Sequence, residues 1–482
     1  MGERRRISSV HARPNPVAKH ICRKEVRFEV ELLPSDQASA HAGQLAVLAL
    51  FNQFGLWERV RQEVALDPRL QKTKGFDPEV LVVQLVCCLT SGGVSLADAE
   101  RLNEDTALKA LLGIAAFADQ TTLGEWLREV GEAGWQAVRR INRALVAWVL
   151  GQAEPGRYLH CGRLEGFFDD TQIEVSGKNF EGAKINYEGN LALSWQTLWA
   201  GPLLADGILG ATSETKESPR SEEAGRDVSN CLPELLTANA ELWAGRRGYL
   251  YADSASSAGK YLELIGSQFE AWSVSYNKWT GPLERKAAEL PEWAWSAEEK
   301  ARWNDGTEHL AQYASFTYQP GGCEQPQRFA VVRHKQADGE FFWRYAFVAA
   351  PAGATDPQLV FEHHRLKGDK ERAFSEVLSD LDLHHPPCAE LKANRVFYAL
   401  AGFAYNVLQA LKLIHLPVSE QPKRVRTLIR HLLLLPVEIK RHARRLKACL
   451  YVPAGWLAWW RGFLAQLLPQ CRQLGVVTVG AG

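Results

Sequence analysis

Two adjacent carboxylates interrupt a segment that otherwise has the sequence of a β-strand. The segment LEGFFDDTQIEVSG is rich in β-branched and aromatic residues and ends at a glycine, yet Asp169 and Asp170 lie in its middle. Aspartate is depleted in strands, and burial of an unpaired carboxylate costs free energy. A metal ion bound to one of the two would explain an acid at this position.

Two further acids are candidates for the same metal site. Asp253 follows a predicted strand over 249–252 and precedes a serine-rich helix start, where on its own it would be explained as an N-cap. Glu371 lies on a predicted helix four residues after Lys367, which on its own would indicate a surface ion pair. Hard cations such as Mg²⁺ take oxygen ligands, and two of them can promote phosphodiester chemistry. One aspartate of the pair, with Asp253 and Glu371, is therefore predicted to bind two Mg²⁺ ions, for which Mn²⁺ can substitute.

The elements that must position these acids alternate between strands and helices. The segments LEGFFDDTQIEV, LALSWQTLW and LLADGILGA are three predicted strands, and a helix, a strand, a helix and a strand follow them. This order predicts a mixed α/β core. We expect one mixed sheet flanked by helices from about 160–275 and 350–410. A β-rich insertion over 277–349, with a hairpin about Asp338-Gly339, is expected outside that sheet.

Helical and basic regions flank the predicted core. Residues 38–150 carry apolar residues at helical spacing, with a helix end at Gly113 and a capping box from Thr122 to Glu125. The net charge is zero, but residues 421–482 contain eleven Lys and Arg against one acid, and a second basic cluster lies near the start of the chain. Such basic segments would neutralise the phosphates of a nucleic acid. The alternative interpretation is that they form a solvated helix face and a disordered tail.

The composition argues against several classes of protein and site. The nine cysteines are scattered without a CxxC pair, which argues against a disulfide framework and a zinc site. The sequence has no HExxH motif, no run of 18 apolar residues and no secretory signal. We therefore expect a cytosolic protein that does not span a membrane.

Taken together, these motifs resemble those of DDE transposases of bacterial insertion sequences, which have an RNase H-like catalytic core. The resemblance is to insertion-sequence family thirteen-eighty, a relative of family four, and it covers most of the chain. It rests on four segments: FDDTQIEVSG…EGA…Y (168–187), YADS (251–254), RLKGDKERAFSEVLSDL (365–381) and KANRVFYALAGFAYNVLQ (392–409). The resemblance implies an RNase H-like mixed sheet flanked by helices, with helical regions at both ends of the chain.

The resemblance also implies which acids form the site. The first would be Asp169, two residues before the threonine, although Asp170 stands where a small residue is usual. Asp253 would be the second acid and Glu371 the third. Strand alternation allows only one of the adjacent aspartates to face the site.

Accessory residues follow the family less closely. Lys367 stands where an arginine is typical, His364 where a tyrosine is, and Leu378 where a lysine is. We expect DNA phosphates to be contacted by basic residues of the third motif and of the C-terminal region: Arg365, Lys367, Arg441, Arg444 and Arg445. In related enzymes a tryptophan of the insertion stacks on a flipped base, and the candidates here are Trp279, Trp293, Trp295, Trp303 and Trp343.

The implied activity is hydrolysis of DNA at transposon ends, followed by attack of the freed 3′-hydroxyl on target DNA. The implied partners are the terminal inverted repeats and target DNA, bound by a homodimer in the bacterial cytoplasm at the nucleoid. The chain is divided into a basic segment (1–37), a helical, DNA-binding region (38–155), the catalytic core (156–276 and 350–415) interrupted by the β-rich insertion (277–349), and a basic helical C-terminal region (416–482).

Two alternatives belong to other functional classes. A transposase-derived DNA-binding protein without activity would also have the basic ends, and Leu378 in place of a lysine leaves room for it. A glycoside hydrolase would suit the 16 tryptophans and the paired acids, but it leaves the basic ends unexplained.

Overall fold

The computed structural model describes residues 36–176, 179–186, 188–211, 231–277, 280–302, 306–337, 340–442 and 445–468, and it gives only the backbone of 211, 369–371, 441–442 and 445. Residues from Gln37 onward belong to one unit.

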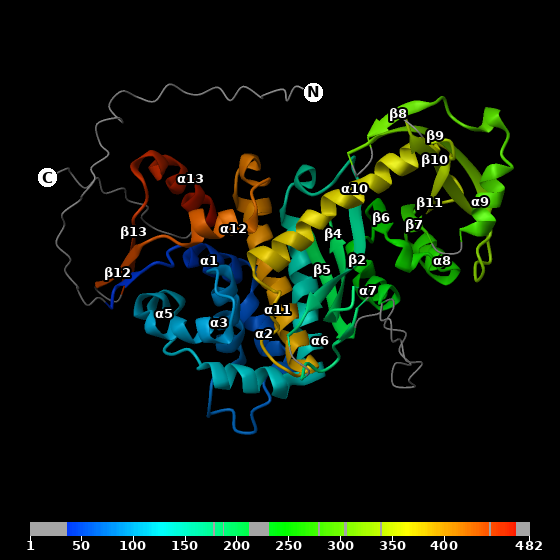
Figure 1. The fold of residues 1–482 in the computed structure, drawn as a ribbon. Helices are drawn as coiled ribbons and strands as arrows, with labels where there is room; N and C mark the ends of the chain where they lie inside the picture. Colours follow the sequence, from blue (N-terminus) through cyan, green and yellow to red (C-terminus); the bar gives the residue numbers. More distant parts are fainter. Residues whose placement is uncertain are drawn as a thin grey trace, which may run out of the picture. The chain divides into compact units, whose positions relative to one another are not determined.

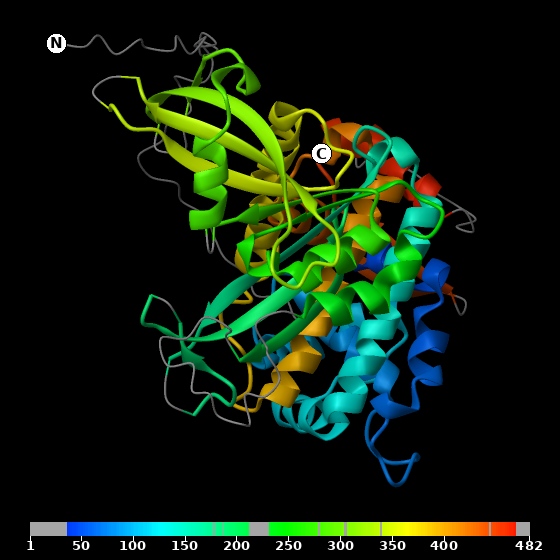
Figure 2. The same ribbon diagram turned by 90° about the vertical axis from the view of Figure 1, so that its right-hand side faces the viewer.

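A mixed sheet of ten strands lies at the centre of the described residues (Figures 1 and 2). The strands are β2 (Leu164–Glu174), β3 (Lys184–Ile185), β4 (Leu191–Ala200), β5 (Leu203–Ala211), β6 (Gly248–Ala252), β7 (Ala271–Tyr276), β8 (Glu299–Arg302), β9 (Glu308–Tyr318), β10 (Gln327–Gln336) and β11 (Arg344–Ala350). Their order is β3-β4-β2-β6-β7-β11-β10-β9-β8, and β5 also pairs with β4. β2 is antiparallel to β4 but parallel to β6, and β6 is parallel to β7. The predicted mixed sheet is therefore confirmed.

The insertion extends this sheet instead of lying outside it. β11 pairs antiparallel with β7, with Phe347 opposite Tyr276, and β10, β9 and β8 follow in turn. The expectation that 277–349 lies outside the sheet is therefore wrong. The physical reason is that β7 would otherwise present an edge of unpaired backbone N–H and C=O groups, which β11 satisfies. The predicted hairpin forms from β10 and β11, and its turn at Asp338-Gly339 falls outside the described residues.

Helices cover both faces of the sheet. They are α10 (Pro357–Ser375) and α11 (Leu391–Ala410) on one face, and α7 (Leu232–Asn239) and α8 (Gly259–Gln268) on the other; α9 (Gly281–Ala288) belongs to the insertion. Phe167 of β2 packs edge-on against Phe374 of α10, with ring centroids 5.9 Å apart, whereas a side chain at Gly166 would meet Trp243 on the opposite face. Because strand side chains alternate, Asp169 shares the α10 face.

The N-terminal region is helical as predicted. Its helices are α1 (Gln44–Phe54), α2 (Leu56–Gln62), α3 (Pro78–Thr90), α4 (Leu96–Arg101), α5 (Thr106–Leu112) and α6 (Gln120–Gln152). Gly113 ends α5 with a φ of 70°, the left-handed C-cap expected there. The prediction of a capping box at Thr122 is wrong, because Asp119 caps α6 by accepting a hydrogen bond from the Thr122 backbone N–H.

The C-terminal region is helical only in part. It contains α12 (Val425–Leu428), β12 (Val437–His442), β13 (Arg445–Leu450) and α13 (Leu457–Leu467). β12 and β13 pair with each other and β12 pairs with β1 (Ala38–Ser39), so the helical prediction is wrong over 437–442 and 445–450. Alternation explains the strand, since Val437 and Ile439 both point into a small apolar cluster with Ala42 and Ala107.

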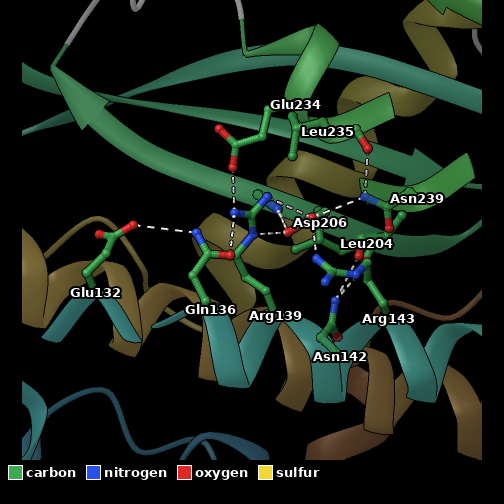
Figure 3. A network of polar contacts seen from close by, with 12 residues as sticks. Glu132, Gln136, Arg139, Asn142, Arg143, Leu204, Asp206, Glu234, Leu235 and Asn239 are labelled. Carbon is green, nitrogen blue, oxygen red and sulfur yellow. Dashed lines mark hydrogen bonds and ion pairs between the residues drawn. The ribbon is translucent and has the colours of Figure 1, made fainter. Parts of the chain in front are cut away.

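A buried ionic network joins the N-terminal helices to the sheet (Figure 3). Arg139 of α6 donates two hydrogen bonds to Asp206 of β5, at 2.8 and 2.9 Å, and a third to Glu234 of α7 at 2.7 Å. Arg143 and Asn239 also contact the Asp206 carboxylate, at 3.2 and 3.1 Å. Asp206 thus connects α6, β5 and α7.

One helix of the described residues is long and apolar enough to cross a membrane, by length and composition alone. It is α11 with its following turn, Leu391–His415, and 89% of its most apolar stretch is buried inside the structure. Such burial is typical of the core helix of a folded domain.

Candidate active site

Asp169 and Asp253 follow paired residues of two adjacent parallel strands. The pairing of β2 with β6 ends where Phe168 lies opposite Ala252, and the next residue of each chain segment is an aspartate. Asp253 also caps the short turn after β6, because its side chain accepts a hydrogen bond of 2.9 Å from the backbone N–H of Ala255. The N-cap explanation is therefore correct for Asp253, which also follows the residue paired with Phe168.

Strand alternation separates the two adjacent aspartates. Asp169 faces α10, and its Oδ2 lies 3.3 Å from Nζ of Lys367. Asp170 lies on the other face, where its Oδ2 accepts hydrogen bonds from Ser194 at 3.2 Å and Gln172 at 3.0 Å. Of the two, Asp169 therefore shares the face of α10 and Lys367.

The surroundings of Asp169 disfavour the ionised form of its carboxyl group. Burial raises the pKa of Asp169 to about 7, and the negative charges of Asp253 and Asp170 add to the effect while Lys367 opposes it. The side chains of Asp169 and Lys367 are 17% and 18% exposed. The ammonium group of Lys367 alone therefore does not offset the free-energy cost of ionising Asp169 in a buried position beside other carboxylates.

The third predicted acid lies on the helix that crosses this face. Figure 1 shows α10 extending from the insertion strands across the sheet. Glu371 lies on α10 one turn beyond Lys367, a spacing that places two residues on the same side of a helix. Its side chain falls outside the described residues. Among the side chains that are described, no group of three His, Cys, Asp or Glu residues is arranged to bind a metal ion.

The predicted DNA-contacting residues lie in two separate parts of the fold. Arg365 is exposed on α10 and donates a hydrogen bond of 3.3 Å to the hydroxyl of Tyr313 on β9. The backbone of Arg441 is part of β12 and that of Arg445 is part of β13, whereas Arg444 falls outside the described residues.

The candidate tryptophans of the insertion differ in environment. Trp293 is 86% exposed, whereas Trp295 is 7% exposed and packs on the guanidinium of Arg333 at 4.4 Å. Trp343 packs on the same guanidinium at 4.8 Å. The remaining two, Trp279 and Trp303, fall outside the described residues.

His364 is a positioning residue whose contacts the sequence did not indicate. Its two ring nitrogens lie 2.9 Å from the Ser273 hydroxyl and 2.7 Å from the Ser275 hydroxyl, both on β7. Burial lowers its pKa to about 4, and the charge of Lys367 acts in the same direction, so the ring is neutral at pH 7. The alternating serines of β7 were the available signal, since they present two hydroxyls to one face.

Comparison with known protein families finds a match over most of the chain. No curated protein matches the sequence. Residues 32–466 match the family described as transposase DDE domain group 1, so the match includes the sheet, α10 and the three predicted acids. The chain belongs to this family of DDE transposases.

Proposed function

We propose that this chain hydrolyses phosphodiester bonds at transposon ends and then joins the freed 3′-hydroxyl to target DNA. The observation that supports the proposal is the position of two carboxylates, Asp169 and Asp253, after paired residues of adjacent parallel strands beside α10. Membership of a DDE transposase family supports DNA as the substrate.

The donor set fits a pair of hard cations. Asp169, Asp253 and Glu371 offer only carboxylate oxygens, and a cation would stabilise the ionised form of Asp169, whose pKa burial raises to about 7. They would hold two Mg²⁺ ions, or Mn²⁺ in their place, which when bound activate the attacking oxygen and stabilise the leaving one.

Basic residues would hold the DNA. Nζ of Lys367 lies 3.3 Å from Oδ2 of Asp169, and with Arg365 this side chain would contact phosphates along α10. The C-terminal arginines 441, 444 and 445 would contact phosphates with little sequence preference. Trp293 is the described tryptophan of the insertion whose exposure of 86% leaves its ring accessible to an extrahelical base.

The finer classification is part of the proposal. The strand order β5-β4-β2-β6-β7, three antiparallel strands followed by two parallel ones, supports an RNase H-like core. We further propose membership of insertion-sequence family thirteen-eighty, a homodimer on the terminal inverted repeats, and action in the bacterial cytoplasm at the nucleoid.

The test is nicking and joining of DNA that carries the inverted repeats flanking the reading frame, in Mg²⁺ or Mn²⁺. Asp169→Asn, Asp253→Asn and Glu371→Gln should each abolish cleavage, because each removes a metal-binding oxygen, while DNA affinity stays near that of the parent. The matched control is Asp170→Asn, which should cleave normally because that side chain lies on the opposite face with Ser194.

Each contrary outcome has a distinct meaning. Cleavage by Glu371→Gln at the parent rate would refute the two-metal site. Tight DNA binding by the parent without cleavage would favour the inactive, transposase-derived binder. Turnover of glycans without added metal would favour the glycoside hydrolase.

A further inference from the structure

The turn that leads into β2 carries an exposed cysteine in a backbone conformation that cysteine rarely adopts. His160 and Arg163 exchange two backbone hydrogen bonds, and the two residues between them, Cys161 and Gly162, have φ values of 49° and 73°. A two-residue hairpin turn with positive φ at both central positions favours Asn, Asp and Gly. The turn therefore explains Gly162 but gives no reason for Cys161.

The thiol of this cysteine is the first of three side chains in series. Sγ of Cys161 lies 3.7 Å from Nε2 of His160, and Nδ1 of His160 lies 3.0 Å from Oε1 of Glu165. Glu165 is 7% exposed, and the hydroxyl of Tyr251 donates a hydrogen bond of 2.9 Å to the same oxygen. A fixed acid, an imidazole that it orients and a thiol are the groups that make a cysteine nucleophilic.

A cavity of about 410 Å³ adjoins this series. His160 and Glu165 line it, together with residues of α10 and of the segment that follows α11, whereas Cys161 lies beside His160 outside this lining. Three basic residues also line it, and each donates a hydrogen bond to a backbone carbonyl group: Arg157, Arg372 and Lys412. Its volume is that of a site for a small molecule.

One wall residue of the cavity has an unused hydrogen-bonding atom. Glu376 is 6% exposed; its Oε1 lies 3.6 Å from Nε of Arg372, and its Oε2 has no hydrogen-bond partner among the described residues. A ligand that carries carboxylates for the cations and an N–H donor for Glu376 would complement this lining.

We propose that Cys161 is a nucleophilic thiol that undergoes exchange with disulfides of small thiols bearing carboxylate and amine groups, which the cavity holds. His160 takes the thiol proton at Nε2, and the sulfur of Cys161 attacks one sulfur of the small disulfide. A new S–S bond forms as the old one breaks, and the departing thiolate receives the proton from His160. Cys161 is oxidised to a mixed disulfide and half of the small disulfide is reduced to a thiol, so no other oxidant is needed. This site is independent of the proposed transposase chemistry.

The test treats the full-length protein with oxidised glutathione and follows each cysteine by peptide mass spectrometry. Cys161 should be modified at least about tenfold faster than the partly buried Cys231 and Cys449. His160→Gln and Glu165→Gln should slow modification of Cys161 at least about fivefold. Equal rates at the three cysteines would overturn the proposal, because Cys161 would then have no special reactivity. An unchanged rate in His160→Gln would also overturn it, because exposure alone would then account for the faster reaction of Cys161.

Two further measurements isolate the cavity and the turn. Cystamine, a small disulfide that carries amines but no carboxylates, should react with Cys161 more slowly than oxidised glutathione does. Similar rates for the two reagents would refute the role of the cavity. Cys161→Asn should remain folded, because asparagine suits the turn, and should show no modification at this position.

Discussion

Replacement of Asp169 by asparagine should stabilise the metal-free protein near neutral pH. The folded pKa of Asp169 is about 7, against an ordinary value of 3.8. The difference corresponds to up to about 4 kcal/mol, at about 1.4 kcal/mol for each tenfold change in the ionisation equilibrium. Asparagine has nearly the same shape and no charge, but it leaves Lys367 without its carboxylate partner. We therefore expect a net gain in the free energy of unfolding of roughly 1–2 kcal/mol at pH 8.

The sign of the pH dependence follows from the direction of the pKa shift. Because the folded pKa of Asp169 exceeds the unfolded one, the native state binds more protons between about pH 4 and pH 7. The stability contributed by this group is fully present below pH 3.8 and is lost as the pH rises through about 7. The advantage of Asp169→Asn should therefore be large at pH 8 and small or absent near pH 4.

Urea unfolding in the presence of a chelator measures this difference. The free energy of unfolding is determined for the parent, Asp169→Asn and Asp170→Asn at both pH values, and the comparison between variants cancels all other titrating groups. Asp170→Asn should not reproduce the gain, because the Asp170 carboxylate accepts hydrogen bonds from Ser194 and Gln172. If Asp169→Asn is no more stable than the parent at pH 8, the raised pKa of Asp169 is refuted.

Two other predictions concern the buried network and the basic hairpin. Asp206→Asn should lower the free energy of unfolding by roughly 3 kcal/mol, because it leaves the buried Arg139 without its carboxylate partner. Glu234→Gln should lower it by less than about 1 kcal/mol, because the Glu234 side chain is 53% exposed. Chemical denaturation measures both, and equal effects would contradict the assignment of Asp206 as the central acid. Replacement of three arginines by glutamine should flatten the slope of log K for DNA binding against log[salt]: Arg441, Arg444 and Arg445. An unchanged slope would mean that these arginines are solvated and do not contact DNA phosphates.

The strands and helices that carry the acids were predictable because their signals are local. The β2 segment has its aromatic and β-branched residues in sequence, and Asp253 follows a short apolar strand. The pairing of β11 with β7 was not predictable in this way. Phe347 and Tyr276 lie far apart in the sequence, and periodicity does not say which strand covers an exposed edge.

The choice between Asp169 and Asp170 illustrates the same limit at the level of one side chain. Alternation requires that one of them face the site, but it cannot say which face α10 covers. The contact of Asp169 with Lys367 shows that Asp169 is the one that shares the face of α10, and this contact depends on how a helix about 200 residues later in the chain packs on the sheet. The β12–β13 hairpin was missed for a different reason, because its many basic residues obscure the apolar alternation of Val437 and Ile439.

α10 is the element through which the rest of the fold acts on the candidate site. Near its C-terminal end Phe374 packs edge-on against Phe167 of the sheet, and in its N-terminal half His364 forms a hydrogen bond with Ser273 of β7. Lys367 lies between these two anchors. Neither anchor involves a group that is charged at neutral pH, since the His364 ring is neutral there. The packing of α10 therefore holds Lys367 near the strand ends whatever the charge of the neighbouring carboxylates, and this position would persist when a cation changes that charge.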